Sequence, residues 1–309
     1  MKALVKRYKE NLVIICFPES REIYEYVFPD VEYEIITRSD FIQGRIAGTK
    51  LIKMIYRISP KLIYDFTGSV LSATLIFWYR ADMTFGFNKR EFSSLYDRYL
   101  PVKKTPHLMD SFYDVLDLDE NNYIREYEFK HSHESSGGIL IHPFAGWAAK
   151  EWGLEKFISL ANSLNTKYVC SIIVPQGSLS DKTLMQIEDS KIPLIQTTSI
   201  KDLFNKISKC SVFVSNDSGP LYIASLCGKA TFTIYGPTNP VYSIPFGKNH
   251  AFVRKIIHCT PTENHQYCFT NAGRKGCHNF ECMKTLSDKE VYTQLLPFLE
   301  KHVPEKSIA

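Results

Sequence analysis

The sequence predicts an α/β fold of two domains, each built on a parallel sheet, and three observations lead to this class. The 309 residues are enough for two domains of ordinary size. Short apolar runs alternate with segments of helical spacing, a pattern typical of parallel strands joined by helical crossovers. Residues 130–138 are polar, small and glycine-rich, as linkers are. We therefore expect domains at 1–130 and 139–309, facing a cleft.

The composition is that of an ordinary globular protein, with 44% hydrophobic and 23% charged residues. The net charge of +4 gives no indication of nucleic-acid binding. The N-terminus lacks the apolar core and cleavage site of a signal peptide, and the apolar run 70–79 is too short to span a bilayer. We expect a cytoplasmic protein, and peripheral association with the inner membrane stays open.

The second half shows the alternation most clearly. Its apolar runs are continuous, which fits a sheet that is buried on both faces. Strands are expected at 138–144, 168–174, 192–196, 212–215 and 231–235, and helices at 154–164, 181–190, 200–210, 220–227 and 287–302. The first half is less regular, with strands expected at 12–17, 33–37 and 62–66 and helices at 69–80 and 107–116.

Three loops after predicted strands are candidates for chemistry, because ligands of open α/β sheets bind at the carboxyl ends of the strands. In the first loop, Ser218 and Gly219 precede a helix that has Pro220 in its first turn. Backbone N–H groups at such a helix start bind phosphate, and a glycine permits close approach. The alternative is simple capping of the helix by Asp217 or Ser218.

The other two loops are shorter. Gly236, Pro237 and Thr238 follow the strand 231–235, and the alternative there is an ordinary tight turn. His142 closes the strand 138–144 and is followed by Lys150, which could bind a phosphate as a point charge. The alternative for Lys150 is a solvated surface lysine.

Taken together, these loops resemble a known family. The segment SNDSGPLYIASLCGKATFTIYGPTNP, residues 215–240, is similar to the nucleotide-sugar signature of the bacterial heptosyltransferases, glycosyltransferase family 9. The resemblance continues in IHPFAGWAAKEWGLEKFISLA, in CMKTLSDKEVYTQLLPFL and, in the first half, in LIYDFTGSVLSATL. It covers about residues 60–309.

The resemblance implies two Rossmann-like domains facing a cleft, the glycosyltransferase B type. It implies inverting transfer of a heptose, or a related sugar, from an ADP-sugar held by the second domain. The acceptor would be a lipopolysaccharide core or a similar glycan, and catalysis would need no cofactor. The residues that match the family's donor site are His142, Lys150, Asp181, Asp217, Ser218, Gly219, Tyr222, Gly236, Pro237 and Thr238, and Lys150 is also a catalytic candidate.

The sequence departs from the family at two positions. The Gly-Asp pair that normally follows the first strand, and whose aspartate is the proposed general base, is absent. Glu19 follows the strand 12–17 and is our candidate for the base; the alternative is a carboxylate that only stabilises a helix start. Tyr222 stands where the family mostly has histidine, which bears on the identity of the donor sugar.

The eight cysteines fall into two groups. Cys16, Cys170, Cys210 and Cys227 lie in apolar segments and are expected to be small buried side chains. The other four resemble a four-cysteine segment of some family members, which implies a structural iron or zinc; the alternative is free, reduced thiols. This second group is Cys259, Cys268, Cys277 and Cys282.

Two other function classes stay open. A nucleotide-sugar epimerase or hydrolase could use the same scaffold, because a fold does not determine its reaction. A non-catalytic relative that binds a nucleotide sugar or a glycan would account for the missing Gly-Asp pair. Turnover of the donor would favour an enzyme, and tight binding without turnover would favour the binding protein.

Overall fold

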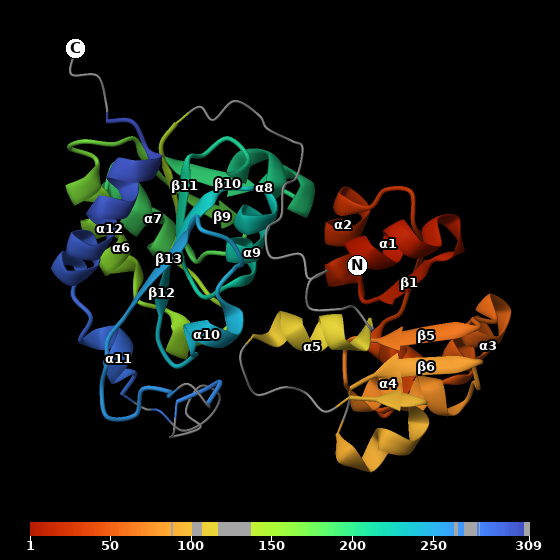
Figure 1. The fold of residues 1–309 in the computed structure, drawn as a ribbon. Helices are drawn as coiled ribbons and strands as arrows, with labels where there is room; N and C mark the ends of the chain where they lie inside the picture. The colour runs from red at the N-terminus through yellow and green to blue at the C-terminus, as the bar shows by residue number, and fades with distance from the viewer. Residues whose placement is uncertain are drawn as a thin grey trace. The chain divides into compact units, whose positions relative to one another are not determined.

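The computed structural model divides the chain into two compact units (Figure 1). The first comprises Met1–Lys103 and His107–Tyr123, and the second Lys104–Pro106 and Ile124–Ala309. The structure describes residues 1–87, 89–100, 107–116, 137–262, 265–268, 277 and 279–305. Nearly all of the linker that we expected at 130–138 lies outside these described residues.

The second unit is built on one six-stranded sheet, in which every neighbouring pair is parallel. The parallel sheet expected from the sequence is thereby confirmed. The strand order is β10-β9-β8-β11-β12-β13, so the chain starts in the middle and builds outward in both directions. The strands are β8 (Ile139–His142), β9 (Cys170–Pro175), β10 (Leu194–Thr197), β11 (Val212–Asn216), β12 (Ala230–Tyr235) and β13 (His250–Arg254).

Helices connect these strands, and every helix that the sequence predicted in this unit is present. Serine side chains cap three of them: Ser180, Ser199 and Ser287 each accept a hydrogen bond from a first-turn backbone N–H. The helices are α6 (Leu154–Leu164), α7 (Asp181–Asp189), α8 (Ile200–Ile207), α9 (Gly219–Leu226), α10 (Pro240–Ser243), α11 (Glu281–Lys284) and α12 (Asp288–His302).

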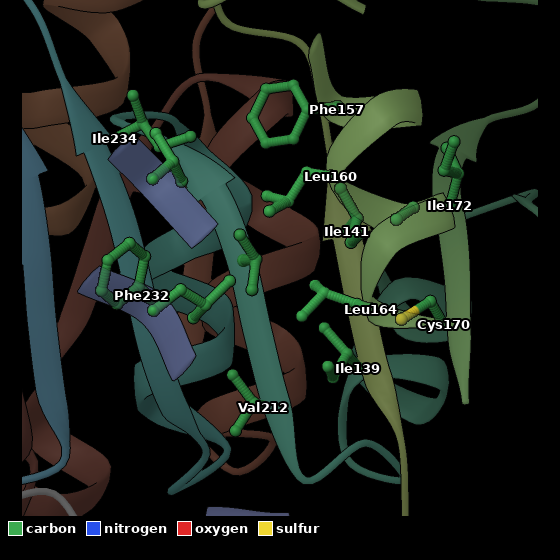
Figure 2. Packing of buried hydrophobic residues seen from close by; sticks show 14 of the residues in the cluster. Ile139, Ile141, Phe157, Leu160, Leu164, Cys170, Ile172, Val212, Phe232 and Ile234 are labelled. Atoms are coloured by element: carbon green, nitrogen blue, oxygen red, sulfur yellow. The ribbon is translucent and has the colours of Figure 1, made fainter. Parts of the chain in front are cut away.

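The core of the second unit lies between the sheet and the pair of helices α6 and α12. Figure 2 shows Leu160 and Leu164 of α6 beside the side chains of Ile139 and Ile141 of β8. The apolar side chains of α12 recur every fourth residue, which places them on one face of the helix. They are Val291, Leu295 and Leu299, all inaccessible to solvent.

The first unit is smaller, and the part of it that the structure describes contains three separate sheets. Two are parallel: β1 (Val13–Cys16) with β2 (Glu32–Ile35), and β5 (Leu62–Asp65) with β6 (Met83–Gly86) and β7 (Arg98–Tyr99). The third is an antiparallel hairpin of β3 (Phe41–Ile42) and β4 (Ile46–Ala47). The helices are α1 (Lys2–Tyr8), α2 (Pro18–Val27), α3 (Thr49–Ile58), α4 (Val70–Phe77) and α5 (Leu108–Val115).

The sequence predicted the three strands β1, β2 and β5 and the two helices α4 and α5, with ends shifted by a few residues. In the first unit it did not predict α1, α2, α3, β3, β4, β6 or β7, and in the second it did not predict α10, α11 or β13. Helix α4 starts one residue later than expected because Ser69 is its N-cap, in a capping box with Ser72. Among the helices that the structure describes, none has the length and the apolar character needed to cross a bilayer.

We expect Leu295→Ala to lower the free energy of unfolding of the second unit by about 2–5 kcal/mol, because the substitution leaves a cavity where α12 meets the core. Chemical denaturation followed by circular dichroism measures this difference. Gln294→Ala, at the exposed neighbouring position of the same helix, is the matched control and should change the free energy by less than about 0.5 kcal/mol. Equal effects of the two substitutions would contradict this account of the core.

Candidate functional site

Strands β8 and β11 are adjacent at the centre of the second sheet, and from them the chain builds outward in opposite directions. Open parallel sheets bind their ligands beside the carboxyl ends of such a strand pair. Strand β8 ends at His142 and β11 ends at Asn216. The polar loops singled out from the sequence therefore meet at one edge of one sheet.

The carboxylate of Asp217 connects three of these loops. Lys150 Nζ, from the loop after β8, and Thr238 Oγ1, from the loop after β12, each donate a hydrogen bond to Asp217 Oδ2 at 2.7 Å. The hydroxyl of Tyr222, on α9, lies 3.5 Å from Asp217 Oδ1. The Asp217 side chain is 5% exposed and that of Lys150 18%. The structure thus brings together four of the predicted site residues, of which Asp217 and Thr238 are buried, Lys150 is mostly buried and Tyr222 is 39% exposed.

A second contact orients Lys150. Its ammonium lies over the ring of Trp147, 4.7 Å from the ring centre, a distance typical of a cation–π contact. The lysine is the last residue of a short 3₁₀ helix, Ala148–Lys150. The carboxylate and the indole together fix the ammonium at the carboxyl edge of the sheet.

Asn216 is a site residue that the sequence reasoning missed. Its side chain is fully buried, donates to the carbonyl of Pro143 at 2.8 Å, and accepts from the backbone N–H of Trp152 at 3.1 Å. It therefore fixes the loop after β8, which carries Lys150, against the end of β11. The sequence did contain a signal for this role: Asn216 is a polar amide at the end of an apolar strand, and a buried amide needs hydrogen-bond partners.

Helix α9 begins at Gly219, directly after Asp217 and Ser218. Ser218 is the N-cap residue, but its side chain caps no backbone N–H, and its buried hydroxyl has no hydrogen-bond partner among the described residues. The Asp217 carboxylate bonds to Lys150 and Thr238 instead. Simple capping by either side chain, the alternative that the sequence left open, is therefore wrong. A Cβ at Gly219 would meet no atom within 4 Å, so space is available at this helix start.

Gly236 and Pro237 serve to pack the loop after β12. A Cβ on Gly236 would lie 2.9 Å from Cγ and Sδ of Met283, so a larger residue would require Met283 to shift. The carbonyl of Pro237 accepts a hydrogen bond from the backbone N–H of Cys268 at 2.9 Å. These two residues fix the turn from which Thr238 reaches Asp217.

Two aromatic side chains at the site are held uncharged. Burial lowers the pKa of His142 to about 4, and its ring stacks on Phe213 with the centroids 6.5 Å apart. The imidazole is therefore neutral near pH 7. Burial, followed by the neighbouring charge of Asp217, raises the pKa of Tyr222, whose hydroxyl donates to the carbonyl of Ser243 at 2.9 Å.

Two predicted residues lie outside this cluster. Asp181 is the exposed first residue of α7, which follows β9 at the same sheet edge, and no hydrogen bond or ion pair among the described residues joins it to the cluster. Glu19 lies in the first unit, exposed in the first turn of α2 after β1. Their roles remain predictions.

Burial follows the expectation for three of the first four cysteines, and Cys227 departs from it. Cys16, Cys170 and Cys210 are buried, Cys227 is half-buried, and none of the eight forms a disulfide. Cys259, Cys268, Cys277 and Cys282 line one cavity of about 230 Å³, together with Gly236 and Pro237.

Four thiols are a donor set that suits iron or zinc. Burial, and then the neighbouring thiol of Cys259, raises the pKa of Cys282 to about 11, and the backbone N–H of Phe280 donates to the sulfur of Cys277 at 3.2 Å. Within the described ranges, however, the structure contains no group of three or more histidine, cysteine or acidic side chains arranged to hold a metal ion. The thiols share a cavity without forming a closed tetrahedral site.

Three comparisons bear on identity. A lipooligosaccharide heptosyltransferase 2 of Campylobacter jejuni is 26% identical over 168 residues, which are 50% of this chain and 49% of that protein. The chain therefore matches about half the length of this curated relative. The solved E. coli ADP-heptose lps heptosyltransferase II superposes with a TM-score of 0.69 at 15% identity, covering 97% of this chain and 93% of that one. The E. coli heptosyltransferase WaaC with ADP superposes with a TM-score of 0.70 at 13% identity, covering 97% and 92%.

These structural matches confirm the α/β fold with parallel sheets, similar to heptosyltransferases of the glycosyltransferase B type. Residues 49–272, well over half of the sequence, match the family described as glycosyltransferase family 9 (heptosyltransferase). The chain belongs to glycosyltransferase family 9.

Proposed function

We propose that the chain is an inverting glycosyltransferase that transfers a heptose, or a related sugar, from an ADP-sugar to a lipopolysaccharide core or a similar glycan. The observation that carries the proposal is the cluster of Lys150, Asp217 and Thr238 beside the start of α9, at the centre of the parallel sheet. Membership of the family supports the choice of donor, as do the two solved relatives, an ADP-heptose lps heptosyltransferase and a heptosyltransferase with ADP.

The chemistry follows from where negative charge develops. The acceptor hydroxyl attacks the anomeric carbon, the bond from that carbon to the diphosphate oxygen breaks, and ADP departs with the bonding electrons. The ammonium of Lys150 and the backbone N–H groups at the start of α9 stabilise the departing diphosphate. Ser218, whose hydroxyl has no partner among the described residues, donates a further hydrogen bond to it.

Asp217 acts as a positioning residue in this scheme. Its carboxylate accepts hydrogen bonds from Lys150 and Thr238, so it is not available as a base. It fixes the ammonium in one place before the donor binds, which lowers the cost of ordering a long side chain in the complex.

The proton of the acceptor hydroxyl needs a base, and we assign this role to Glu19. Its carboxylate is exposed after the first strand of the first unit. Asp65, the other carboxylate at a strand end of this unit, is less suited because Thr67 donates to its Oδ1 and Tyr96 to its Oδ2. Asp181, one strand away from the cluster, is assigned to the ribose of the donor.

We expect Lys150→Ala and Asp217→Ala each to weaken binding of ADP and of ADP-heptose at least about tenfold, which corresponds to about 1.4 kcal/mol. Removal of Lys150 takes away the cation, and removal of Asp217 releases it from its position. Isothermal titration calorimetry measures both affinities. Lys167→Ala is the matched control, because this exposed lysine precedes β9 at the opposite edge of the same sheet.

Unchanged affinity of both variants for ADP and ADP-heptose would contradict the donor-site assignment. Donor binding with no turnover of ADP-heptose, in the presence or absence of acceptor glycans, would favour the non-catalytic relative. Turnover that survives Glu19→Gln would remove that residue from the mechanism while leaving the donor site intact.

The buried His142 predicts a pH dependence of stability. Its folded pKa of about 4 lies below the value of about 6.5 in the unfolded chain, so the unfolded state binds more protons between these values. The stabilisation is complete above pH 6.5 and declines as the pH falls toward 4. Between pH 7 and pH 4.5 the loss from this residue is about 2–3 kcal/mol. Urea unfolding of His142→Gln should show a correspondingly smaller decline than the parent chain, and parallel declines would contradict this account.

We further propose that the four cysteines at the cavity hold a structural iron or zinc, whose binding draws together thiols that form no closed set in its absence. The support is that all four line one cavity and that a backbone N–H already donates to one sulfur. Chain purified without chelators should contain about one metal ion per molecule by elemental analysis. Cys282→Ser should lower this content, whereas Cys227→Ser, away from the cavity, should not. A metal-free parent chain with eight titratable thiols would favour the free-cysteine alternative.

A further inference from the structure

The large hydrophobic side chains that are exposed in the described part of the first unit all fall within residues 42–83. Phe77 is 67% exposed, Tyr56 60% and Trp78 45%. Such a concentration on one small unit is unusual for a surface that faces only water. The full set is Ile42, Ile46, Tyr56, Leu62, Phe77, Trp78 and Met83, which we call the apolar face.

The topology brings the members of the apolar face together. Strands β5 and β6 are parallel, and their first residues, Leu62 and Met83, are register partners. Helix α3 leads into β5 and α4 leads into β6, so the C-terminal ends of both helices lie at the edge where these strands begin. Contacts between the two helices bear this out, because the ring of Tyr56 meets that of Tyr79, just beyond α4, edge to face at 5.3 Å.

The hairpin of β3 and β4 adds the two isoleucines. Thr74 of α4 donates to the carbonyl of Arg45 at 3.1 Å and accepts from the backbone N–H of Ala47 at 3.2 Å. Thr74 is one helical turn before Phe77 and Trp78, on the same side of α4. The hairpin is therefore held against α4 one turn before this aromatic pair, and its two exposed large hydrophobic side chains are those of Ile42 and Ile46, which are register partners.

The segment that carries the apolar face, residues 42–83, is predominantly positive. Residues 42–83 contain six basic and two acidic residues, a net charge of +4, which equals the net charge of the whole chain. Of the two acidic residues, Asp65 is buried, so only Asp82 is exposed. Four exposed cations in the segment form no ion pair with any residue that the structure describes: Arg45, Lys53, Lys61 and Arg80.

We propose that the apolar face and these four cations dock the first unit onto the surface of an anionic lipid bilayer. Tryptophan and tyrosine favour the boundary between headgroups and acyl chains, and exposed phenylalanine and isoleucine side chains gain by entering it. Lysine and arginine beside them are attracted by acidic headgroups. The proposal does not rest on the transfer reaction.

Charge complementarity favours a bilayer over a second copy of this chain. A symmetric dimer through the apolar face would oppose the same cations on both subunits, which is unfavourable. The cores of protein interfaces are, in addition, depleted in lysine, whereas a bilayer surface accommodates lysine at its headgroups.

The test is co-sedimentation of the full chain with vesicles. Phosphatidylcholine vesicles that contain about one-third phosphatidylglycerol should bind the chain, and pure phosphatidylcholine vesicles should bind it at least about tenfold more weakly. High salt should release the chain from the anionic vesicles. The double substitutions Phe77→Ser/Trp78→Ser and Lys53→Glu/Arg80→Glu should each weaken anionic binding at least about tenfold.

Matched controls separate the apolar face from general hydrophobicity and charge. Met185→Ser removes a side chain that is 62% exposed on α7 of the second unit, and Lys201→Glu reverses an exposed charge on α8. Neither should change vesicle binding. Circular dichroism and ADP titration of the double variants establish that their fold is retained. If ADP fails to bind the parent chain, the proposed donor is wrong, but the vesicle result still tests the docking proposal.

Three results would overturn the proposal: no preference for anionic vesicles, equal loss of binding in the controls, or undiminished binding by both double variants. Light scattering adds a fourth. If the parent chain is a dimer that Phe77→Ser/Trp78→Ser converts to a monomer, the apolar face joins two copies of this chain and the bilayer is not its partner.

Discussion

The carboxylate of Asp217 is almost fully buried, and the arrangement of the site depends on how its charge is compensated. An isolated carboxylate in a protein interior is costly, and removal of one member of a buried ion pair leaves the other uncompensated. Lys150 supplies the cation and Thr238 a neutral donor, both to the same oxygen. These partners come from different loops, so compensation of one charge fixes the loops after β8, β11 and β12 relative to one another.

The same arrangement explains why the start of α9 is free for a ligand. A serine or aspartate before a helix usually accepts a hydrogen bond from a first-turn backbone N–H. Here Asp217 is engaged by Lys150, and Ser218 makes no cap. The positive end of the helix is therefore not neutralised by its own N-cap side chain, which is the condition under which it attracts a phosphate.

Much of the second unit could be predicted from the sequence, because its strands are buried on both faces and read as continuous apolar runs. Strand β13 was missed, since its burial is partial and His250 and Arg254 interrupt the apolar pattern. In the first unit the strands are short and only partly buried, so periodicity indicated fewer elements. Helix α3 illustrates the limit: its three lysine and arginine residues suggested a solvated surface, while Leu51, Met54 and Ile55 on its other face are buried.

Local sequence indicated loops that the structure brings together at the candidate site, but it could not indicate contacts between residues far apart in the chain. The hydrogen bonds of Asn216 join residues 73 and 64 positions apart, and nothing in the local pattern specifies such partners. The cation–π contact of Lys150 with Trp147 spans only three residues, yet it depends on a 3₁₀ turn that a short run of alanines does not predict.

The cysteine segment and the donor loop are physically continuous. Cys268 donates its backbone N–H to Pro237, Tyr267 forms a β-bridge with Thr238, and Met283, next to Cys282, packs against Gly236. Thr238 in turn donates to Asp217. Because each contact fixes the backbone of the loop after β12, a change in the cysteine segment that breaks these contacts is expected to move the hydroxyl that helps to compensate Asp217. The segment that carries the four cysteines therefore supports, through the backbone of residues 267 and 268 and the side chain of Met283, the loop that holds Thr238 against Asp217, whether or not the thiols hold a metal ion.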